Sequence, residues 1–131
     1  MNEWDITKGG WRDSDLRAYL QSAVLQVMPS NISKRLVWVK KKQELANGDI
    51  QFTEDKIWIP DRSEIFGKDA LYFDLFQASD ENRVRTRNGS ASWWWLRSVA
   101  NNENFRNVVN DGSSSNFYAY ASGGVALGFC L

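Results

Sequence analysis

The chain has 131 residues, which is the length of one ordinary domain and enough to bury a sizeable core. Its 16 basic and 16 acidic residues cancel, so no net charge directs it to nucleic acid or to an anionic membrane. One Cys and no His exclude an internal disulfide and a conventional zinc site, and they remove the commonest general base. We therefore expect no metal ion, no cofactor and no nucleic-acid partner.

The first 16 residues predict neither export nor membrane insertion. They lack the charged start and the apolar core of a secretory signal. Elsewhere no run approaches the roughly 18 consecutive apolar residues that a membrane-spanning helix needs. We expect a soluble protein with no membrane span that is either cytoplasmic or carried on a virion.

Residues 14–28 carry the clearest helix pattern in the chain. Asp13 or Ser14 can cap the first turn, and Pro29 follows the end. Apolar residues recur across this segment at helical spacing, namely Leu16, Leu20, Ala23, Val24 and Val27. Residues 30–35 are predicted to add a short turn of helix.

Two short strands are predicted in the middle of the chain. Residues 35–41 (RLVWVKK) are β-branched and aromatic, and residues 56–60 (KIWIP) form a second apolar strand that the final proline stops. Between them, ANGD at residues 46–49 signals a turn. Residues 62–66 then predict a helical turn that Gly67 closes in the left-handed conformation.

The segments that follow alternate between aromatic and basic character. Residues 71–78 (LYFDLFQA) are ambiguous between a helix and a buried strand, and residues 83–90 predict a polar, basic loop. Residues 91–96 predict a buried strand. The three tryptophans at 93–95 must alternate between the two faces of that strand, so we expect two of them to be buried.

The end of the chain contains turn signals and a final apolar block. NDG at residues 110–112 and SGG at residues 122–124 predict strands that double back with exposed loops between them. Residues 129–131 predict a last strand tied into the core, with Cys130 as a buried small hydrophobe. The whole pattern predicts an α+β fold with one or two helices packed on short antiparallel strands and long irregular loops.

Residues 99–131 have a distinct composition. They contain no Lys, Gln, Met or Trp and a single Glu, Glu103, and they are rich in Asn, Ser, Gly and Tyr. Tyr offers a large, stiff contact area, while Ser, Gly and Asn offer adaptable hydrogen bonding, as in binding surfaces. Disordered tails share this composition. We favour an ordered, loop-rich surface, because WWWL precedes the segment and GVALGFCL ends it.

The genetic code sharpens this interpretation. Randomising the two adenines of an Asn codon of the form AAY yields NNY codons, which encode Asn, Tyr, Ser, Asp, Gly, Phe, Val, Arg and several others. These codons cannot encode Lys, Glu, Gln, Met or Trp. Nearly every residue in the range 101–123 is reachable in this way, with Glu103 as the exception. The segment is therefore predicted to be a hypervariable ligand-binding region.

Three parts of the chain together resemble a known family. They are residues 10–17 (GWRDSDLR), residues 56–67 with KIWIP and SEIFG, and a C-terminal frame. The frame starts with SWWWLRS at residues 92–98, includes Asn104, Phe105, Val108 and Gly112, and ends with GVALGFCL. The chain resembles the variable proteins diversified by diversity-generating retroelements in phages, bacteria and archaea. It is similar in particular to small members with a C-type-lectin fold of the formylglycine-generating-enzyme subclass.

The resemblance implies one C-type-lectin-like domain over residues 1–131, with a scaffold at 1–98 and a variable region at 99–131 that ends in a core strand. In that family an error-prone reverse transcriptase copies a template repeat with substitutions at adenines, and the product overwrites the 3′ end of the gene. The substituted side chains occupy an exposed, loop-supported face while a fixed frame packs underneath. The positions that match the frame are Trp94, Trp95, Leu96, Arg97, Phe105, Val108, Gly112, Gly124, Val125, Phe129 and Cys130. The positions that match the substituted, ligand-binding set, called the candidate set below, are Asn101, Asn102, Arg106, Asn107, Val109, Asn110, Asp111, Ser113, Ser115, Asn116, Phe117, Tyr118, Tyr120, Ser122 and Gly123.

The chain departs from the family pattern in several places. Val99 stands where family members often have Pro, and no Glu-Pro-Asn or Trp-Asn-Asp motif of a calcium-dependent sugar site occurs. The enzyme that names the subclass depends on reactive cysteines, and this chain has one Cys. A hydrolase is disfavoured as well, because the carboxylate pairs Asp61/Glu64 and Asp80/Glu81 have no neighbouring nucleophile or metal-ligand set in the sequence.

We therefore predict a non-catalytic protein that binds a protein or glycan ligand through a diversified C-terminal surface. Phe117, Tyr118 and Tyr120 are its predicted aromatic anchors, since rigid aromatic side chains dominate binding hot spots. The identity of the ligand and the oligomeric state stay open, with a monomer slightly favoured. The alternative is an invariant adhesin or a structural module of the tail-fibre type, which predicts no sequence variation at residues 101–123.

Overall fold

A continuous helical rod with one irregular turn begins the fold. In the computed structural model, which describes residues 1–67, 74–77 and 79–131, three segments form this rod, namely α1 (Asp15–Tyr19), the π-helical turn η1 (Leu20–Val24) and α2 (Leu25–Val27). The hydroxyl of Ser14 caps the rod by accepting the backbone N–H of Arg17 at 3.2 Å. The helix predicted over residues 14–28 is confirmed, and α3 (Ser30–Ser33) confirms the short turn after it. Among the described residues no helix is both long and apolar enough to cross a membrane.

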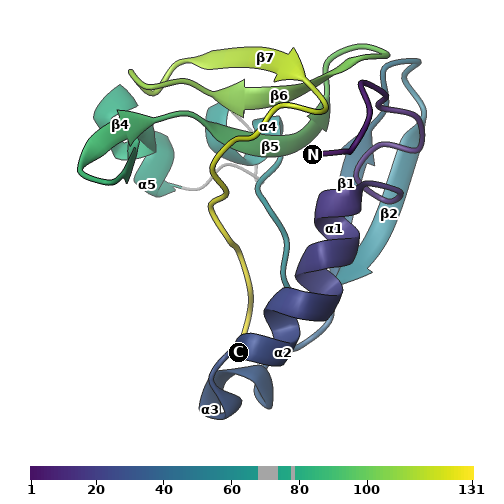
Figure 1. Cartoon of the computed structure of the whole chain (residues 1–131), viewed down its shortest axis with the longest axis vertical. Coiled ribbons are helices and arrows are strands. Elements are labelled where there is room, and N and C mark those ends of the chain that lie inside the picture. Colours follow the sequence, from purple (N-terminus) through teal and green to yellow (C-terminus); the bar gives the residue numbers. More distant parts are fainter. Residues whose placement is uncertain (68–73, 78) are drawn as a thin grey trace.

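An antiparallel hairpin of β1 (Val39–Glu44) and β2 (Ile50–Asp55) lies beside this rod (Figure 1). The predicted turn between the strands is confirmed, since the N–H of Leu45 donates to the carbonyl of Asp49 at 2.8 Å. The bounds of the strand predicted over residues 35–41 are wrong, because β1 starts four residues later and ends three residues later. Its inward side chains are polar rather than apolar, and for that reason apolar content misplaces the strand.

Short elements fill the segment between the hairpin and the C-terminal sheet. The predicted helical turn is confirmed as α4 (Arg62–Phe66), but Gly67 has a φ of −70° and is not left-handed. The segment predicted as a strand over residues 56–60 is buried but is not a strand, because only Trp58 pairs, in an isolated bridge with Gly128. Of the ambiguous residues 71–78, Asp74–Gln77 forms α5, while residues 71–73 and 78 lie outside the described residues.

The polar loop predicted over residues 83–90 is instead a second hairpin. A 3₁₀ turn, η2 (Asp80–Arg83), leads into the antiparallel pair β3 (Arg85–Arg87) and β4 (Ser90–Ser92). Asn88 and Gly89 join the two strands with φ angles of 52° and 79°. An Asn-Gly pair with two positive φ angles is the commonest signal for a two-residue hairpin turn. The high charge of the segment obscures that signal in the sequence.

The C-terminal part of the chain forms a three-stranded antiparallel sheet at one end of the molecule (Figure 1). Its strands, in spatial order, are β5 (Trp94–Val99), β6 (Asn104–Val108) and β7 (Ser114–Tyr118). The strand predicted over residues 91–96 is displaced toward the C-terminus, because residues 90–92 pair in the preceding hairpin. The turn predicted at residues 110–112 is confirmed, and Gly112 adopts the φ of 86° that such a turn requires.

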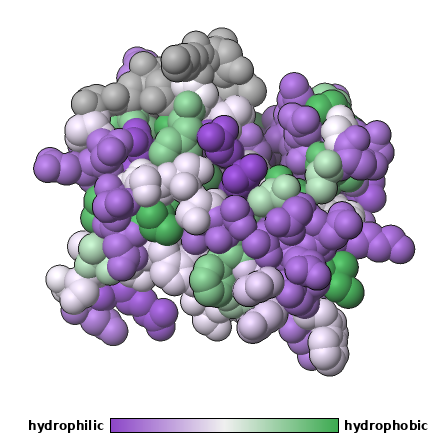
Figure 2. All heavy atoms as spheres, turned by 90° about the horizontal axis from the view of Figure 1, so that it is seen from above, coloured by the Kyte–Doolittle hydropathy of each residue, from purple (hydrophilic) through white to green (hydrophobic). Residues whose placement is uncertain are grey.

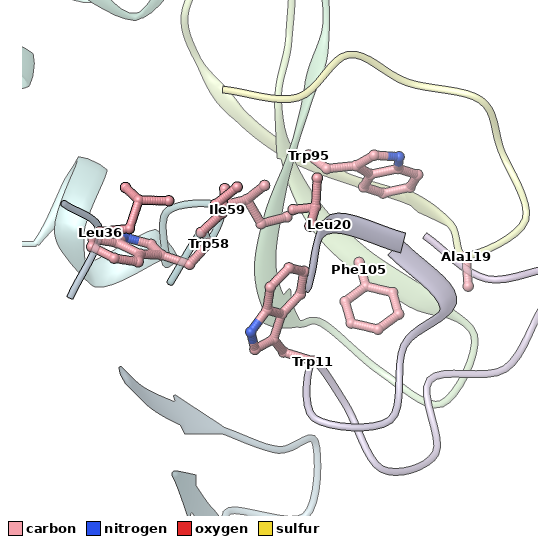
Figure 3. Packing of buried hydrophobic residues seen from close by; sticks show 9 residues of the cluster. Trp11, Leu20, Leu36, Trp58, Ile59, Trp95, Phe105 and Ala119 are labelled. Atoms are coloured by element: carbon pink, nitrogen blue, oxygen red, sulfur yellow. The ribbon is translucent and has the colours of Figure 1, made fainter. Parts of the chain in front are cut away.

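Hydrophobic clusters pack on both faces of this sheet. Trp95 and Phe105 belong to the larger cluster together with Trp11 and other side chains from the rod and the middle of the chain (Figure 3). Trp94 faces the opposite way and packs in a second cluster with Leu96, Val108, Ile65 and Phe76. Adjacent residues on a strand point to opposite faces, so a sheet covered on both sides buries both. Two of the three consecutive tryptophans are therefore buried, as predicted.

The final residues run as an extended segment from the sheet toward the far end of the rod (Figure 1). Backbone hydrogen bonds hold this segment, with Trp58 and Gly128 joined by two of them and the N–H of Val37 donating to the carbonyl of Cys130 at 3.2 Å. The prediction of a core strand with a buried Cys130 is wrong, because Cys130 is exposed and Val125 and Phe129 are 43% and 41% exposed. This part of the expected frame is attached through its backbone rather than through buried side chains.

A buried network of ion pairs joins the first hairpin, α4 and the sheet. Nη1 of Arg97 donates to Oε2 of Glu64 at 2.7 Å and to the carbonyl of Ile59 at 2.8 Å. Nζ of Lys41 lies 2.6 Å from Oε1 of the same glutamate. All three charged side chains are buried. The network explains why the inward face of β1 is polar, because Lys41 and its strand neighbour Gln43 both reach partners in the sheet or in α4.

The ionisation of Glu64 makes a testable contribution to stability. Burial raises the pKa of this carboxyl, but the hydrogen bonds and charges of Arg97 and Lys41 outweigh burial, so its pKa lies below the ordinary value of 4.5. A group with a depressed folded pKa adds stability that is complete above its unfolded pKa and is lost as the pH falls through the folded value. We expect the difference in free energy of unfolding between wild type and Glu64→Gln to be steady above about pH 5.5 and to shrink below about pH 4.5. Urea unfolding at a series of pH values measures this difference, and a difference that did not change with pH would contradict the assignment.

Candidate ligand-binding surface

The candidate set gathers on β6, β7 and the turns next to them, at the end of the molecule that carries the sheet (Figure 1). Seen from above that end, hydrophilic residues predominate and hydrophobic ones form small, separate areas (Figure 2). The set does not form one face as expected. Ser115 lies in register with Asn107 and Trp95, whereas Asn116 lies in register with Arg106. Adjacent residues of a strand alternate between faces, so the candidate set is divided between the two sides of the β6–β7 ribbon.

Hydrogen bonds to main-chain carbonyls hold the turns that carry the candidate set. The side chain of Thr7 donates to the carbonyl of Asn101 at 2.6 Å, and its N–H donates to the carbonyl of Asn102 at 3.0 Å. At the other end of the ribbon, Nε of Arg83 donates to the carbonyl of Gly112 at 2.9 Å. Because the acceptors are main-chain carbonyls, a change of side chain at Asn101 or Asn102 leaves these bonds available. Gly112 is different, since its φ is 86° and a Cβ atom there would lie 2.0 Å from the carbonyl oxygen of Asp80.

Three polar members of the candidate set also form local hydrogen bonds through their side chains. The Oδ1 atom of Asn101 accepts the backbone N–H groups of residues 103 and 104 at 2.9 and 2.8 Å. Oδ1 of Asn116 accepts from the amide of Asn104 at 2.6 Å. Hydrogen bonds from Ser113 lower the pKa of Asp111, so this carboxylate is ionised at neutral pH. These three residues therefore shape the turns and the ribbon as well as offering contacts to a ligand.

The three predicted aromatic anchors are exposed and lie close to one another. Phe117, Tyr118 and Tyr120 are 46%, 45% and 58% exposed. The rings of Phe117 and Tyr118 meet edge to face at 5.9 Å between centroids, and those of Tyr118 and Tyr120 stack at 6.0 Å. Trp93, which the sequence analysis did not assign to the site, extends the row at 5.5 Å from Phe117. Its position at the start of the tryptophan run was the only available signal.

Two members of the candidate set are not free surface positions. Asn107 is only 2% exposed, because it lies on the inner face of β6 in register with Trp95. Its inclusion among exposed residues is therefore wrong. A Cβ atom added to Gly123 would lie 2.2 Å from the ring of Trp93, so a larger residue there requires that tryptophan to move.

A pocket of about 380 Å³ opens beside the turn that joins β6 to β7. We call it the turn pocket. Five of its lining residues belong to the candidate set and the sixth is Trp93, so the lining consists of Trp93, Asn107, Val109, Asn110, Asp111 and Phe117. The Oδ1 atom of Asn107 is buried and has no hydrogen-bond partner among the described residues. Sequence reasoning did not predict the pocket, since it depends on how the turn folds back beside β5.

Three of the four carboxylates that a hydrolase could use have structural partners, namely Asp61, Glu64 and Asp80. Asp61 and Glu64 cap α4 reciprocally, with the N–H of Ser63 donating to Asp61 at 3.0 Å and the N–H of Asp61 donating to Glu64 at 2.8 Å. Asp80 pairs with Arg83. Within the described ranges, no three or more His, Cys, Asp or Glu side chains gather where they could hold a metal ion.

Residues 2–131 match the family described as "Domain of unknown function (DUF6273)". No curated protein and no solved structure matches the chain significantly. The match extends over nearly the whole sequence, so it includes the rod, both hairpins and the sheet with the candidate set.

Proposed function

We propose that this chain, which belongs to the DUF6273 family, is a non-catalytic ligand-binding protein whose C-terminal surface is diversified by retroelement-mediated mutagenesis at adenines. Its ligand is a protein or a glycan, and the candidate set supplies most of the contacts. The proposal includes a C-type-lectin-like fold of the formylglycine-generating-enzyme subclass. The observed α+β architecture and the extended C-terminal segment that follows the sheet are compatible with that fold.

The observation that carries the proposal is the way in which the β6–β7 ribbon is held. Its turns are fixed through the carbonyls of Asn101, Asn102 and Gly112, and the side chains of Phe105 and Val108 anchor β6 in the two clusters. Members of the candidate set flank these buried anchors along the ribbon. Such an arrangement allows many side chains to change while the backbone keeps its position, which is what a diversified binding surface requires.

Sequencing of the gene's 3′ end and its flanking DNA in the source population tests the proposal. We expect an imperfect repeat nearby, with mismatches confined to template adenines at the codons of the candidate set. The buried residues interleaved with that set serve as internal controls, since Phe105, Val108 and Ala119 are fully buried and should not vary. Asn107 and Gly123 should vary less than exposed Tyr120, because burial and the ring of Trp93 restrict them.

The alternative is an invariant adhesin or tail-fibre-type module with the same architecture. It predicts one sequence throughout the population and no repeat. That result would refute diversification and leave a fixed binding module. Variation spread equally over buried and exposed codons would also count against the proposal, because it would indicate ordinary drift rather than targeted substitution.

A further inference from the structure

Strand β7 is the outermost strand of the C-terminal sheet, and its outer edge pairs with no other strand of the described residues (Figure 1). The opposite edge of the sheet is occupied, because the N–H of Trp95 in β5 donates to the carbonyl of Gly124 at 2.9 Å. An open strand edge pairs readily with other extended chains, so proteins commonly protect it with charges, prolines or bulges. The sequence of β7 is SSNFY, and its register with β6 is continuous. The strand itself therefore has none of these three protections.

The register determines which main-chain groups the open edge presents. The N–H of Val109 donates to the carbonyl of Ser113 at 2.9 Å, and hydrogen-bonded and non-bonded pairs alternate along an antiparallel ladder. The odd-numbered residues of β7 therefore bond to β6. The even-numbered residues direct their N–H and C=O groups outward, and these are Ser114, Asn116 and Tyr118.

Two contacts limit the open edge at its ends. Nε of Arg62 donates to Oγ of Ser114 at 3.4 Å, and the carbonyl of Tyr118 accepts the N–H of Ala121 at 2.9 Å. Between these contacts, the N–H and C=O of Asn116 and the N–H of Tyr118 have no hydrogen-bond partner within the described ranges. The open part of the edge is thus centred on Asn116.

No other described strand presents a comparable edge. Strands β1 (VKKKQE), β2 (IQFTED) and β3 (RTR) all carry charged side chains, and β4 has only three residues. Charge and shortness are usual protections of an edge. The open, uncharged edge of five residues is therefore specific to β7. This strand carries four members of the candidate set, namely Ser115, Asn116, Phe117 and Tyr118.

We infer that β7 binds an extended segment of a protein ligand by strand addition, through main-chain hydrogen bonds to Asn116 and to the N–H of Tyr118. An extended polypeptide offers donors and acceptors at the same two-residue repeat as this edge. Main-chain bonds of this kind supply affinity, while side chains beside them supply specificity. The inference commits the ligand to a protein rather than a glycan.

Recognition through the main chain suits a surface whose side chains vary. The N–H and C=O groups of β7 are the same whichever side chains the strand carries. An added strand would place its own side chains beside those of β7, where Phe117 and Tyr118 are 46% and 45% exposed. The constant edge then holds the segment and the varied side chains select its sequence. This part of the inference rests on the proposed function.

A second copy of the chain is the competing occupant of the edge. Symmetric pairing of two β7 edges would set the same residues of both copies against each other. It would consume the edge in each copy and cover the members of the candidate set on β7. Those residues would then be withdrawn from any ligand, which conflicts with the proposed function. We therefore favour a different protein as the partner.

Peptide probes test the inference on the full chain. Selection from a displayed library of random peptides of about nine residues, long enough to pair along β7, should yield synthetic probes that bind with a Kd of about 100 µM or tighter. In the free protein, the amides of Asn116 and Tyr118 should exchange hydrogen faster than those of Ser115 and Phe117, which donate to β6. A bound probe should slow exchange at Asn116. A library without binders, or a probe that leaves this amide unprotected, would overturn the inference.

Two substitutions of one residue separate the main chain from the side chain. Asn116→Pro removes the outward N–H but none that β6 accepts, and proline is tolerated at such edge positions. Asn116→Ala keeps the N–H, and both variants lose the side-chain hydrogen bond to Asn104. We expect Asn116→Pro to weaken the probe by about tenfold or more and Asn116→Ala by about threefold or less. Equal losses would assign the contact to the side chain and overturn strand addition.

Methylated probes repeat the comparison without changing the protein, so the test survives if Asn116→Pro does not fold. Methylation of alternate peptide nitrogens should weaken binding by about tenfold or more in one phase, where the N–H groups face β7, and much less in the other. Equal sensitivity of both phases would contradict strand addition. A dimer of the free chain that Asn116→Pro dissociates would assign the edge to a second copy instead.

The outcome is separable from that of the proposed function. Failure of the probe tests together with a variable repeat in the gene would refute strand addition while diversification stood. Strand addition in a chain whose gene does not vary would refute diversification and leave a fixed peptide-binding module.

Discussion

Replacing Arg97 by Ala is expected to lower the free energy of unfolding by about 3–5 kcal/mol. The guanidinium is buried, and it donates to Glu64 at 2.7 Å and to the carbonyls of Ile59 and Lys42 at 2.8 and 3.1 Å. Its loss leaves a buried carboxylate with only Lys41 as a cationic partner and leaves buried carbonyls without donors. Removing one partner of a buried ion pair costs far more than the intact pair contributes, because the remaining charge stays in a medium of low polarity.

Urea or thermal unfolding of Arg97→Ala beside Arg12→Ala measures this effect. Arg12 is a matched control, since its side chain pairs with Asp13 but is about half exposed, and its loss should change the free energy of unfolding far less than the loss of Arg97 does. A second comparison tests the origin of the penalty. The triple variant Lys41→Met, Glu64→Leu, Arg97→Met removes all three charges and should be more stable than Arg97→Ala. Equal losses for the Arg97 and Arg12 variants would show that the buried network contributes little.

The same network explains which parts of the fold could be predicted from sequence. The helix over residues 14–28 was predictable, because its cap and its apolar spacing are local signals. Strand β1 was misplaced because its buried side chains are charged or polar. Lys41 belongs inside only because Glu64 and Arg97, distant in sequence, are there to pair with it. No periodicity within the strand itself contains that information.

The C-terminal block shows the opposite error. GVALGFCL is the most apolar part of the tail, and its composition predicted a buried strand. In the fold, Gly128 pairs with Trp58 and the neighbouring apolar side chains remain partly exposed. Glycine rather than the apolar residues determines this contact, because a Cβ atom at residue 128 would lie 2.6 Å from the indole nitrogen of Trp58.

The candidate site was predictable as a segment but not as a shape. Codon restriction and turn signals predicted a variable segment at residues 101–123 with strands that double back, the resemblance implied the candidate set within it, and the NDG turn is present. The division of that set between two faces follows from strand register, which puts Asn107 opposite Trp95 and turns it inward. The register depends on which side chains of β5 face each side of the sheet. With three consecutive tryptophans, the sequence was compatible with either assignment. The register also determines the turn pocket and the presence of Trp93 in its lining.

Replacing Trp95 by Ala is expected to cost about 3–5 kcal/mol, an effect as large as that of Arg97→Ala. Trp95 is 1% exposed and packs edge to face against Phe105, with 6.5 Å between ring centroids. It also contacts Trp93 at 4.8 Å and lies in the cluster that joins the sheet to the helical rod. Deleting the ring leaves a cavity that the interlocked neighbours cannot fill completely.

Unfolding measurements on Trp95→Ala, Trp95→Phe and Trp4→Ala separate burial from residue type. Trp95→Phe retains part of the packing and should cost less, while Trp4, which is 69% exposed, should be replaceable at about 0.5 kcal/mol or less. Amide hydrogen exchange adds a local measurement. Because Asn107 and Ser115 lie in register with Trp95, its loss should lower the protection of β6 and β7 together. If the amides of β6 and β7 kept full protection from exchange in Trp95→Ala, this residue would not support the two strands. Such support matters, because a surface whose outward side chains vary needs a backbone that is held from beneath.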